Sequence, residues 1–124
     1  MQRKTAQRSA IRHAIEHARH ALSPHEILDA AKVEAPGLGI ATVYRTIKAL
    51  VHEGEIVPVE LPGEPPRYER SGKPHHHHFY CRECAQVYPV EGCAHDLNDM
   101  VPKGFSLEEH HVVLYGLCSA CAHQ

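Results

Sequence analysis

The sequence contains no uninterrupted apolar run of about 18 residues, the minimum for a membrane-spanning helix, so we expect no membrane span. Its first residues, MQRKTAQRSAIRHAIEHA, are basic but lack a long apolar core and a small-residue cleavage site, which argues against a signal peptide. An excess of one charge is also missing, because 13 Lys and Arg residues stand against 15 Asp and Glu residues. This balance alone does not indicate a nucleic-acid partner, although residues 1–57, with 8 basic and 6 acidic residues, suit an anionic partner better than the remainder.

The sequence also lacks an H-E-x-x-H motif or a comparable arrangement. A zinc hydrolase needs three protein ligands, an open coordination position and a general base, so we expect no enzyme. Metal-binding side chains, by contrast, are abundant: the chain has 13 histidines, eight of them after residue 70, and five cysteines. In a cytosolic protein, whose thiols stay reduced, this composition indicates metal ligands rather than disulfides.

Three helices are predicted in the first half of the chain. Alanine and isoleucine side chains recur at helical spacing between residues 5 and 18. Ser23 and Glu26 then form a capping box with Pro24 at the first helical position, which predicts that a second helix begins there. The third helix is predicted in IATVYRTIKAL and should end near Gly54.

A ribbon of two short strands is predicted next, in EIVPVELPGEPPRYE, because apolar alternation there surrounds a turn rich in proline and glycine. Three helices followed by such a ribbon make a winged helix-turn-helix domain, which we expect over residues 1–70. The segment SGKP, residues 71–74, is a short punctuated hinge. Residues 75–124 are expected to be mainly strand, in HHHHFYC, VYPV and FSLEEHHVVLYGL, with a short helix in HDLNDMV.

Two Cys-x-x-Cys pairs lie in this second half: Cys81 with Cys84, and Cys118 with Cys121. Two such pairs are typical of a tetrahedral structural zinc site, in which each short turn aims both thiolates at one ion. A site with four thiolate ligands is closed, so it should stabilise the fold rather than catalyse a reaction. The fifth cysteine, Cys93, is predicted to serve packing.

Four consecutive histidines begin the second half. On a strand, His75 and His77 would share one face, and His76 and His78 the other, with about 6.5–7 Å between neighbours on a face. Each pair could then hold part of a metal site and would need ligands from elsewhere. The candidate partners are Glu69, His95, Asp96, Asp99, His110 and His111.

Histidine and carboxylate ligands together suit Zn²⁺, Fe²⁺, Mn²⁺ or Ni²⁺. Solvated polar residues are the favoured interpretation for Asp99, His111 and His123. The same holds for His13 and His17, which are spaced i, i+4 on the first predicted helix and are expected to lie on its polar face.

The third predicted helix has one apolar side and one polar side. In a helix-turn-helix protein the outward side of this helix enters the major groove of DNA. Arginine there could contact guanine, tyrosine could contact thymine methyl groups or phosphate, and lysine is suited to phosphate. Periodicity alone fits an ordinary amphipathic surface helix equally well. The candidate DNA contacts are Thr42, Tyr44, Arg45 and Lys48 on this helix, with Arg8 and Arg12 on the first.

Taken together, GIATVYRTIKAL, HHHHFYC with CREC, and LYGLCSAC resemble the ferric uptake regulator family of metal-responsive bacterial repressors. The resemblance implies an α+β fold, with the winged helix followed by a hinge and a small α/β dimerisation domain over residues 75–124. It further implies a cytoplasmic homodimer, or a dimer of dimers, that binds palindromic double-stranded operator DNA in response to metal.

The resemblance also implies residue roles. Tyr44 and Arg45 match the DNA-reading positions. A structural Zn²⁺ is implied at Cys81, Cys84, Cys118 and Cys121. A sensory site for a regulatory divalent metal (Fe²⁺, Zn²⁺ or Mn²⁺) is implied at Glu69, His76 and His78, with His20 as a neighbouring candidate. A second site is implied at His75, His77 and His110, with its carboxylate from Asp96 or with His95 in that place.

Several positions depart from the family pattern. Ala21 stands where a sensory histidine is common, with His20 adjacent, and Pro89 replaces a common acidic ligand. Ser71 stands where zinc-sensing relatives often have cysteine. An iron-type regulator of metal uptake is favoured, with a zinc-uptake or a peroxide and manganese type as alternatives. From another class, a metal-buffering protein would explain the histidines but would leave the winged helix without a role.

Overall fold

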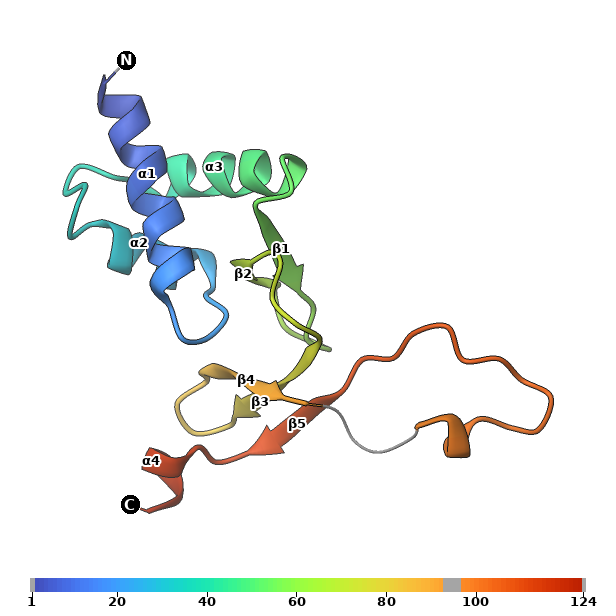
Figure 1. Cartoon of the computed structure of the whole chain (residues 1–124). Helices are drawn as coiled ribbons and strands as arrows, with labels where there is room; N and C mark the ends of the chain where they lie inside the picture. The colour runs from blue at the N-terminus through green and yellow to red at the C-terminus, as the bar shows by residue number, and fades with distance from the viewer. Residues whose placement is uncertain (1, 93–96, 124) are drawn as a thin grey trace. The chain divides into compact units, whose positions relative to one another are not determined.

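The computed structural model describes residues 2–92 and 97–123, which form two compact units, Met1–Lys73 and Pro74–Gln124 (Figure 1). The α+β fold expected from the sequence is confirmed, because helices predominate in the first unit and strands in the second. None of the helices in the described residues is both long and apolar enough to cross a membrane.

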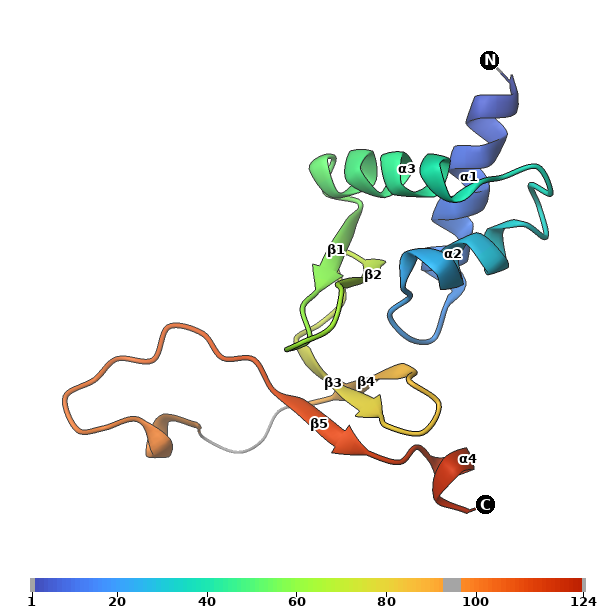
Figure 2. The same ribbon diagram turned by 180° about the vertical axis from the view of Figure 1, so that it is seen from behind.

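The first unit has the element order of a winged helix. Helices α1 (Gln2–His17), α2 (Pro24–Ala31) and α3 (Ile40–His52) precede strands β1 (Ile56–Val59) and β2 (Arg67–Arg70). The two strands pair antiparallel and form the predicted ribbon. Both ribbon views show α3 running across α1 (Figures 1 and 2).

Local signals account for where these helices begin and end. The Ser23 hydroxyl accepts a hydrogen bond from the Glu26 backbone N–H at 3.2 Å, and the Glu26 carboxylate accepts one from the Ser23 backbone N–H at 2.9 Å. This is the predicted capping box, and Pro24 follows it at the start of α2. Gly54, with a φ of 78°, takes the left-handed conformation just beyond α3, as predicted for its end.

Helix spacing places one apolar face of each helix in a shared core. Ile11, Ile27, Val43 and Leu50 are fully buried there. Two backbone hydrogen bonds between Leu22 and Tyr68, 2.9 and 2.8 Å long, join the ribbon to the connection between α1 and α2. The core therefore fixes α3 with its polar side outward.

The second unit is built on a three-stranded sheet in the order β4-β3-β5. Strand β3 (His76–Cys81) pairs antiparallel with β4 (Val87–Glu91) and parallel with β5 (Val113–Gly116). The 3₁₀ turn η1 (Leu97–Met100) lies between β4 and β5, and α4 (Ser119–Ala122) follows β5.

Two secondary-structure predictions need correction. The alternating stretch FSLEEHHVVLYGL was predicted as one long strand, but only its last part, β5, is a strand. Residues 105–112 carry no strand, because nothing in the described chain pairs with them as a ladder. The short helix predicted in HDLNDMV is the single turn η1, and its first two residues lie outside the described residues.

The second unit buries little apolar surface. Among its described residues, the buried apolar side chains are Cys81 and Val87, and His77 is also buried. Met100, Phe105 and other large apolar side chains are exposed. A core this small needs a metal site or a partner chain to stabilise it.

Candidate functional site

Four cysteines meet at one end of the small sheet. Cys81 ends β3, and Cys84 follows in the turn toward β4. Cys118 is the N-cap residue directly before α4, and Cys121 lies within that helix. Their sulfur atoms all lie within 4.8 Å of one another, and the Cys84 and Cys118 sulfurs are 3.9 Å apart. Two thiolates on a tetrahedral zinc, with bonds of about 2.3 Å, are separated by about 3.8 Å. The donor set and its spacing therefore fit a structural zinc ion.

Backbone N–H groups already favour the thiolate form at this site. The Cys84 N–H lies 3.5 Å and the Cys118 N–H 3.3 Å from the Cys81 sulfur. Hydrogen bonds of this kind, from Cys84 first, lower the pKa of Cys81 to about 6. Burial instead raises the pKa of Cys121 to about 12 in the metal-free chain. Bound zinc would keep all four sulfurs deprotonated.

The turn that joins the first cysteine pair has a demanding backbone. Ala85, directly after Cys84, has a φ of 61°, in the left-handed region that residues other than glycine rarely adopt. Its backbone N–H donates to the Cys81 carbonyl at 2.8 Å. The left-handed conformation of Ala85 is locally strained, and it lies next to the converging sulfur atoms. In the same turn the Cys84 backbone N–H points at the Cys81 sulfur.

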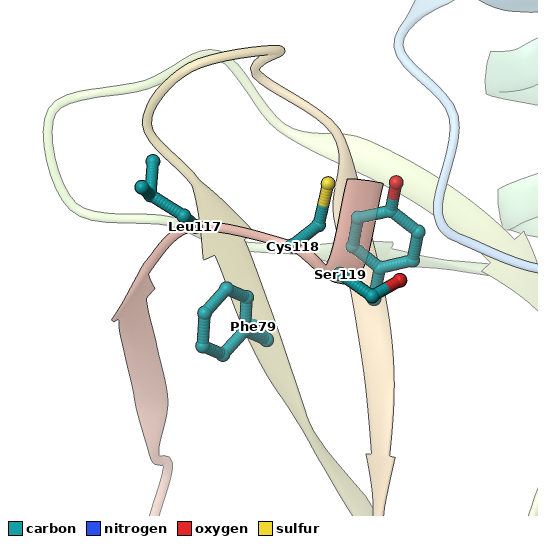
Figure 3. Close-up of a pocket in the computed structure, with 5 residues that line it drawn as sticks. Phe79, Leu117, Cys118 and Ser119 are labelled. Atoms are coloured by element: carbon teal, nitrogen blue, oxygen red, sulfur yellow. The ribbon is translucent and has the colours of Figure 1, made fainter. Parts of the chain in front are cut away.

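A pocket of about 320 Å³ lies against this cysteine site, lined by Phe79, Tyr88, Leu117, Cys118 and Ser119 (Figure 3). A side-chain hydrogen bond between the Tyr88 hydroxyl and the Cys118 sulfur raises the pKa of Tyr88. The pKa of Cys118 is lowered, first by the Cys121 backbone N–H and also by Tyr88. Tyr88 is thus a second partner of a candidate zinc ligand, and residue spacing offered no signal for it.

Three imidazoles form a cluster: His77 lies on β3, His75 directly before that strand, and His110 in the segment before β5. The His75 and His77 Nε2 atoms are 3.2 Å apart, and the His110 ring lies 5.1 Å from the His75 ring and 5.0 Å from the His77 ring. One nitrogen from each of the three lies within 4.8 Å of the others. Burial, and then the charges of His75 and His110, lower the pKa of His77. A low pKa keeps His77 neutral and able to bind a metal.

The other face of β3 carries the second histidine pair. The His76 and His78 rings are 4.8 Å apart, so the alternation expected of a strand is present. The His76 Nδ1 lies 2.8 Å from the Pro74 carbonyl oxygen, which accepts a hydrogen bond from it and leaves Nε2 to act as a ligand.

Of the remaining candidate ligands, Asp99 on η1 and His111 are exposed, as expected of solvated polar residues, and the others fall into two groups. In the first unit, Glu69 is buried on β2, 3.6 Å from the Lys73 ammonium, and His20 is half-buried, with its pKa lowered chiefly by burial. His95 and Asp96, and also Cys93, lie outside the described residues.

The outward side of α3 carries the candidate DNA contacts. Tyr44, Arg45 and Lys48 are exposed, with half of the Tyr44 side chain accessible to solvent. The Arg45 guanidinium donates to the Thr42 hydroxyl at 3.0 Å, which orients it along the helix face. These side chains are not buried in the core, so they can contact a nucleic acid.

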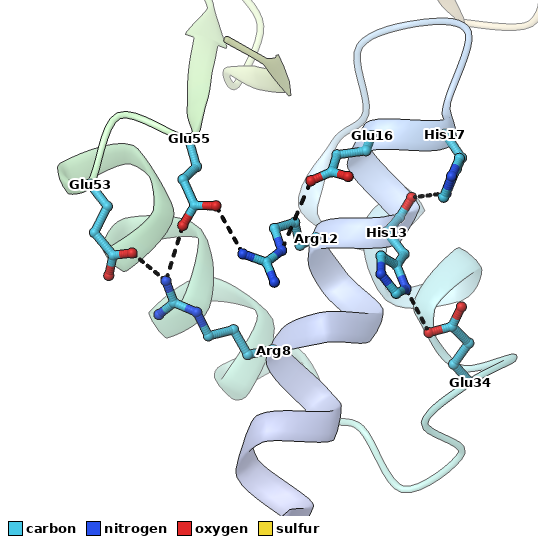
Figure 4. A network of polar contacts seen from close by, with 8 residues as sticks. All are labelled: Arg8, Arg12, His13, Glu16, His17, Glu34, Glu53 and Glu55. Carbon is cyan, nitrogen blue, oxygen red and sulfur yellow. Dashed lines mark hydrogen bonds and ion pairs between the residues drawn. The ribbon is translucent and has the colours of Figure 1, made fainter.

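Two arginines of α1 are engaged by carboxylates instead of being free (Figure 4). Arg8 forms ion pairs with Glu53 and Glu55, and Arg12 lies 3.0 Å from Glu55. Both carboxylates sit in the turn after α3, so the network ties α1 to the end of that helix. A phosphate contact by Arg8 would have to displace them. Sequence reasoning missed this network, since Glu53 and Glu55 are about 45 residues from their partners.

Comparison with known proteins decides the family. The model of the ferric uptake regulator family matches residues 2–115. A ferric uptake regulation protein from Campylobacter upsaliensis is 31% identical over 131 residues, which cover 97% of this chain and 80% of that protein.

The chain belongs to the ferric uptake regulator family.

Solved structures agree with this assignment. The Helicobacter pylori ferric uptake regulator has a TM-score of 0.73 and 26% identity, over 94% of this chain and 79% of that one. FurB from M. tuberculosis, described as a zinc uptake regulator, has a TM-score of 0.54 and 29% identity, over 96% and 95% of the two chains. Proteins of the ferric uptake regulator family are metal-responsive transcriptional regulators that bind DNA as dimers, and they are not enzymes.

Proposed function

We propose that this chain is a metal-dependent repressor of metal-uptake genes, of the iron type, acting as a homodimer in the bacterial cytoplasm. The observation that carries the proposal is the run His75–His78 at the start of β3, in which alternate imidazoles pair and one of the two pairs gathers a third imidazole. The same chain presents an exposed basic and aromatic face on α3. Metal ligands and a DNA-reading helix in one chain support a switch rather than a metal buffer.

The domain assignment follows the sequence. We assign residues 1–70 to the DNA-binding domain, residues 71–74 to the hinge and residues 75–124 to the dimerisation and metal-binding domain. The exposed apolar side chains of the second unit, Leu114 and Leu117 among them, support a surface that a second copy covers. The second copy would bring a second α3, and a palindromic operator has the matching symmetry.

The sensory site is proposed at His76 and His78 with Glu69, and with His20 as a neighbouring ligand. β2 ends at Arg70 and β3 begins at His76, so Glu69 and the histidines lie on either side of the short hinge. A metal held by all of them would restrict the hinge and favour one arrangement of the DNA-binding domains. The metal must bind that arrangement more tightly than the others, and the difference in affinity is the coupling energy.

The second metal site is proposed at His75, His77 and His110, with Asp96 or His95 as a further ligand. The three described imidazoles fit a borderline divalent ion, and a carboxylate would make the set more suitable for Fe²⁺ or Mn²⁺. His110 lies in the segment before β5, so a metal here would fix residues 105–112 against β3.

The DNA contacts are proposed on α3: Arg45 to a guanine edge, Tyr44 to a thymine methyl group or phosphate, and Thr42 and Lys48 to phosphates. Arg8 would add a phosphate contact only where its ion pairs open.

Substitution of the sensory histidines tests the switch. We compare wild type with the double variant His76→Ala and His78→Ala, and with a control in which the exposed His25 and His52 are changed to alanine. Operator affinity is measured by fluorescence anisotropy at buffered free Fe²⁺ without oxygen. The sensory variant should lose most of the metal-induced gain, typically about 5–150-fold, while the control keeps it. A sensory variant with a normal response would refute the proposed gating; a response to Zn²⁺ or Mn²⁺ in place of Fe²⁺ would reassign the effector.

A further inference from the structure

Helix α1 carries two exposed histidines that the metal sites described above do not use. His13 and His17 lie one helical turn apart, and their ring centroids are 5.9 Å apart (Figure 4). Residues spaced i, i+4 are neighbours on one face of a helix. Spacing alone favoured an ordinary polar face, because many such pairs bind nothing.

The contacts of the two rings change that interpretation. The His13 Nδ1 lies 3.3 Å from a Glu34 carboxylate oxygen, and the His17 Nδ1 lies 3.0 Å from the His13 carbonyl oxygen. A carbonyl or carboxylate oxygen only accepts hydrogen bonds, so each Nδ1 carries the hydrogen. In the neutral imidazole each Nε2 then keeps its lone pair.

This arrangement is the one found around histidine metal ligands. A ligating histidine usually donates its other ring N–H to a carboxylate or a backbone carbonyl, which fixes the tautomer and the ring orientation. Here a carboxylate orients one ring and a carbonyl orients the other. Both rings, one helical turn apart on α1, therefore keep an Nε2 lone pair that can bind a metal ion.

We propose that His13 and His17 bind a divalent ion of the Zn²⁺, Ni²⁺ and Cu²⁺ class through their Nε2 atoms, with Glu34 as a positioning residue. Water completes the coordination sphere. Imidazole ligands suit these ions, and affinity rises from Mn²⁺ and Fe²⁺ through Ni²⁺ to Cu²⁺. With two protein ligands, the site fills at a higher free metal concentration than the three-imidazole cluster.

Occupancy of this site has a structural consequence. Glu34 lies in the connection between α2 and α3, within the helix-turn-helix itself. A bound ion strengthens the contact between α1 and that connection. An ion that binds the folded but not the unfolded chain raises the unfolding temperature of the DNA-binding unit.

Nickel titration of the full chain, with its cysteine zinc retained, tests the proposal. Isothermal calorimetry compares wild type with the double variant His13→Ala and His17→Ala. The matched control again changes the exposed His25 and His52 of the same unit to alanine. We expect the double variant to bind one Ni²⁺ fewer per chain and the control to match wild type. Equal stoichiometry in wild type and the double variant would overturn the proposal.

Two further measurements distinguish the loss of metal binding at this site from a loss of folding in the double variant. Ni²⁺ should broaden the amide NMR signals around His13 and His17 in wild type, and unbroadened signals at saturating Ni²⁺ would overturn the site. Glu34→Gln should weaken binding by about 10–100-fold, the usual loss for a partner of a metal ligand, and Glu34→Asp should recover part of it. Unchanged affinity in Glu34→Gln would remove the positioning role of Glu34.

Discussion

The four cysteines fit a zinc ion, and the pKa values of two of them predict how zinc binding there should depend on pH. Zinc binds thiolates, so each thiol that must lose a proton weakens apparent affinity about tenfold per pH unit below its pKa. Cys121 has a pKa of about 12 in the metal-free chain, so it must lose a proton to zinc throughout the neutral and acidic pH range. Cys81 has a pKa of about 6, so it must lose a proton to zinc only below about that pH. In a plot of log apparent Kd against pH, the slope should therefore become steeper by one log unit per pH unit as pH falls through about 6.

The shifted pKa values of Cys81 and Cys121 also make the stability of the metal-free unit depend on pH. The folded pKa of Cys81 lies below the ordinary thiol value of 9.0, so the metal-free unit gains stability from this group above pH 9, and that gain is lost as pH falls toward about 6. Cys121 acts in the opposite direction, because its raised pKa removes stability as pH rises from 9 toward about 12. Protonation of Cys81 on acidification therefore both weakens zinc binding and lowers the stability of the metal-free unit.

Competition with a chromophoric zinc chelator of known pH dependence measures this slope. The titration covers about pH 5 to pH 8, on both sides of the Cys81 pKa. The control variant Cys93→Ser leaves the four predicted ligands in place and should give the same curve. A straight line through pH 6 would refute the assignment of a preformed thiolate at Cys81.

Three other predictions concern the same two units. Tyr88→Phe removes the hydroxyl beside the candidate ligand Cys118 and should weaken zinc binding by about 10–100-fold in the same competition assay; unchanged affinity would contradict the proposed role of Tyr88. In Gly116→Ala the new Cβ would lie 3.0 Å from the Phe79 ring, closer than ordinary van der Waals contact, so the Phe79 ring should move and its ring-proton NMR signals should shift; unshifted signals would contradict this contact. Arg45→Ala should weaken operator binding by about 1–3 kcal/mol and relax specificity at one base pair. Arg8→Ala should weaken binding less, because carboxylates already engage the Arg8 guanidinium. Equal losses of the two variants in an anisotropy assay would contradict this ranking.

Features set by neighbouring residues could be predicted from the sequence. The capping box before α2, the left-handed Gly54 after α3 and the alternation of histidines along β3 each depend on residues only a few positions apart. Physical rules for these features are local, so a single sequence is enough to apply them.

Features set by distant residues were missed or wrong. The parallel pairing of β5 with β3 joins segments more than 30 residues apart, and no local pattern indicates where that ladder stops. Residues 105–112 alternate like a strand but have no strand beside them in the described chain. Likewise, the hydrogen bond of Tyr88 to Cys118 appears only once the sheet has folded.

Metal-dependent operator binding is the central claim, and fluorescence anisotropy on the DNA upstream of the gene tests it most directly. The protein keeps its cysteine zinc, its histidine sites are stripped, and free Fe²⁺, Mn²⁺ or Zn²⁺ is buffered, with oxygen excluded for iron. We predict that affinity rises by about 5–150-fold and that Fe²⁺ acts at the lowest free concentration relative to its cellular level. An affinity that no metal changes would contradict the account.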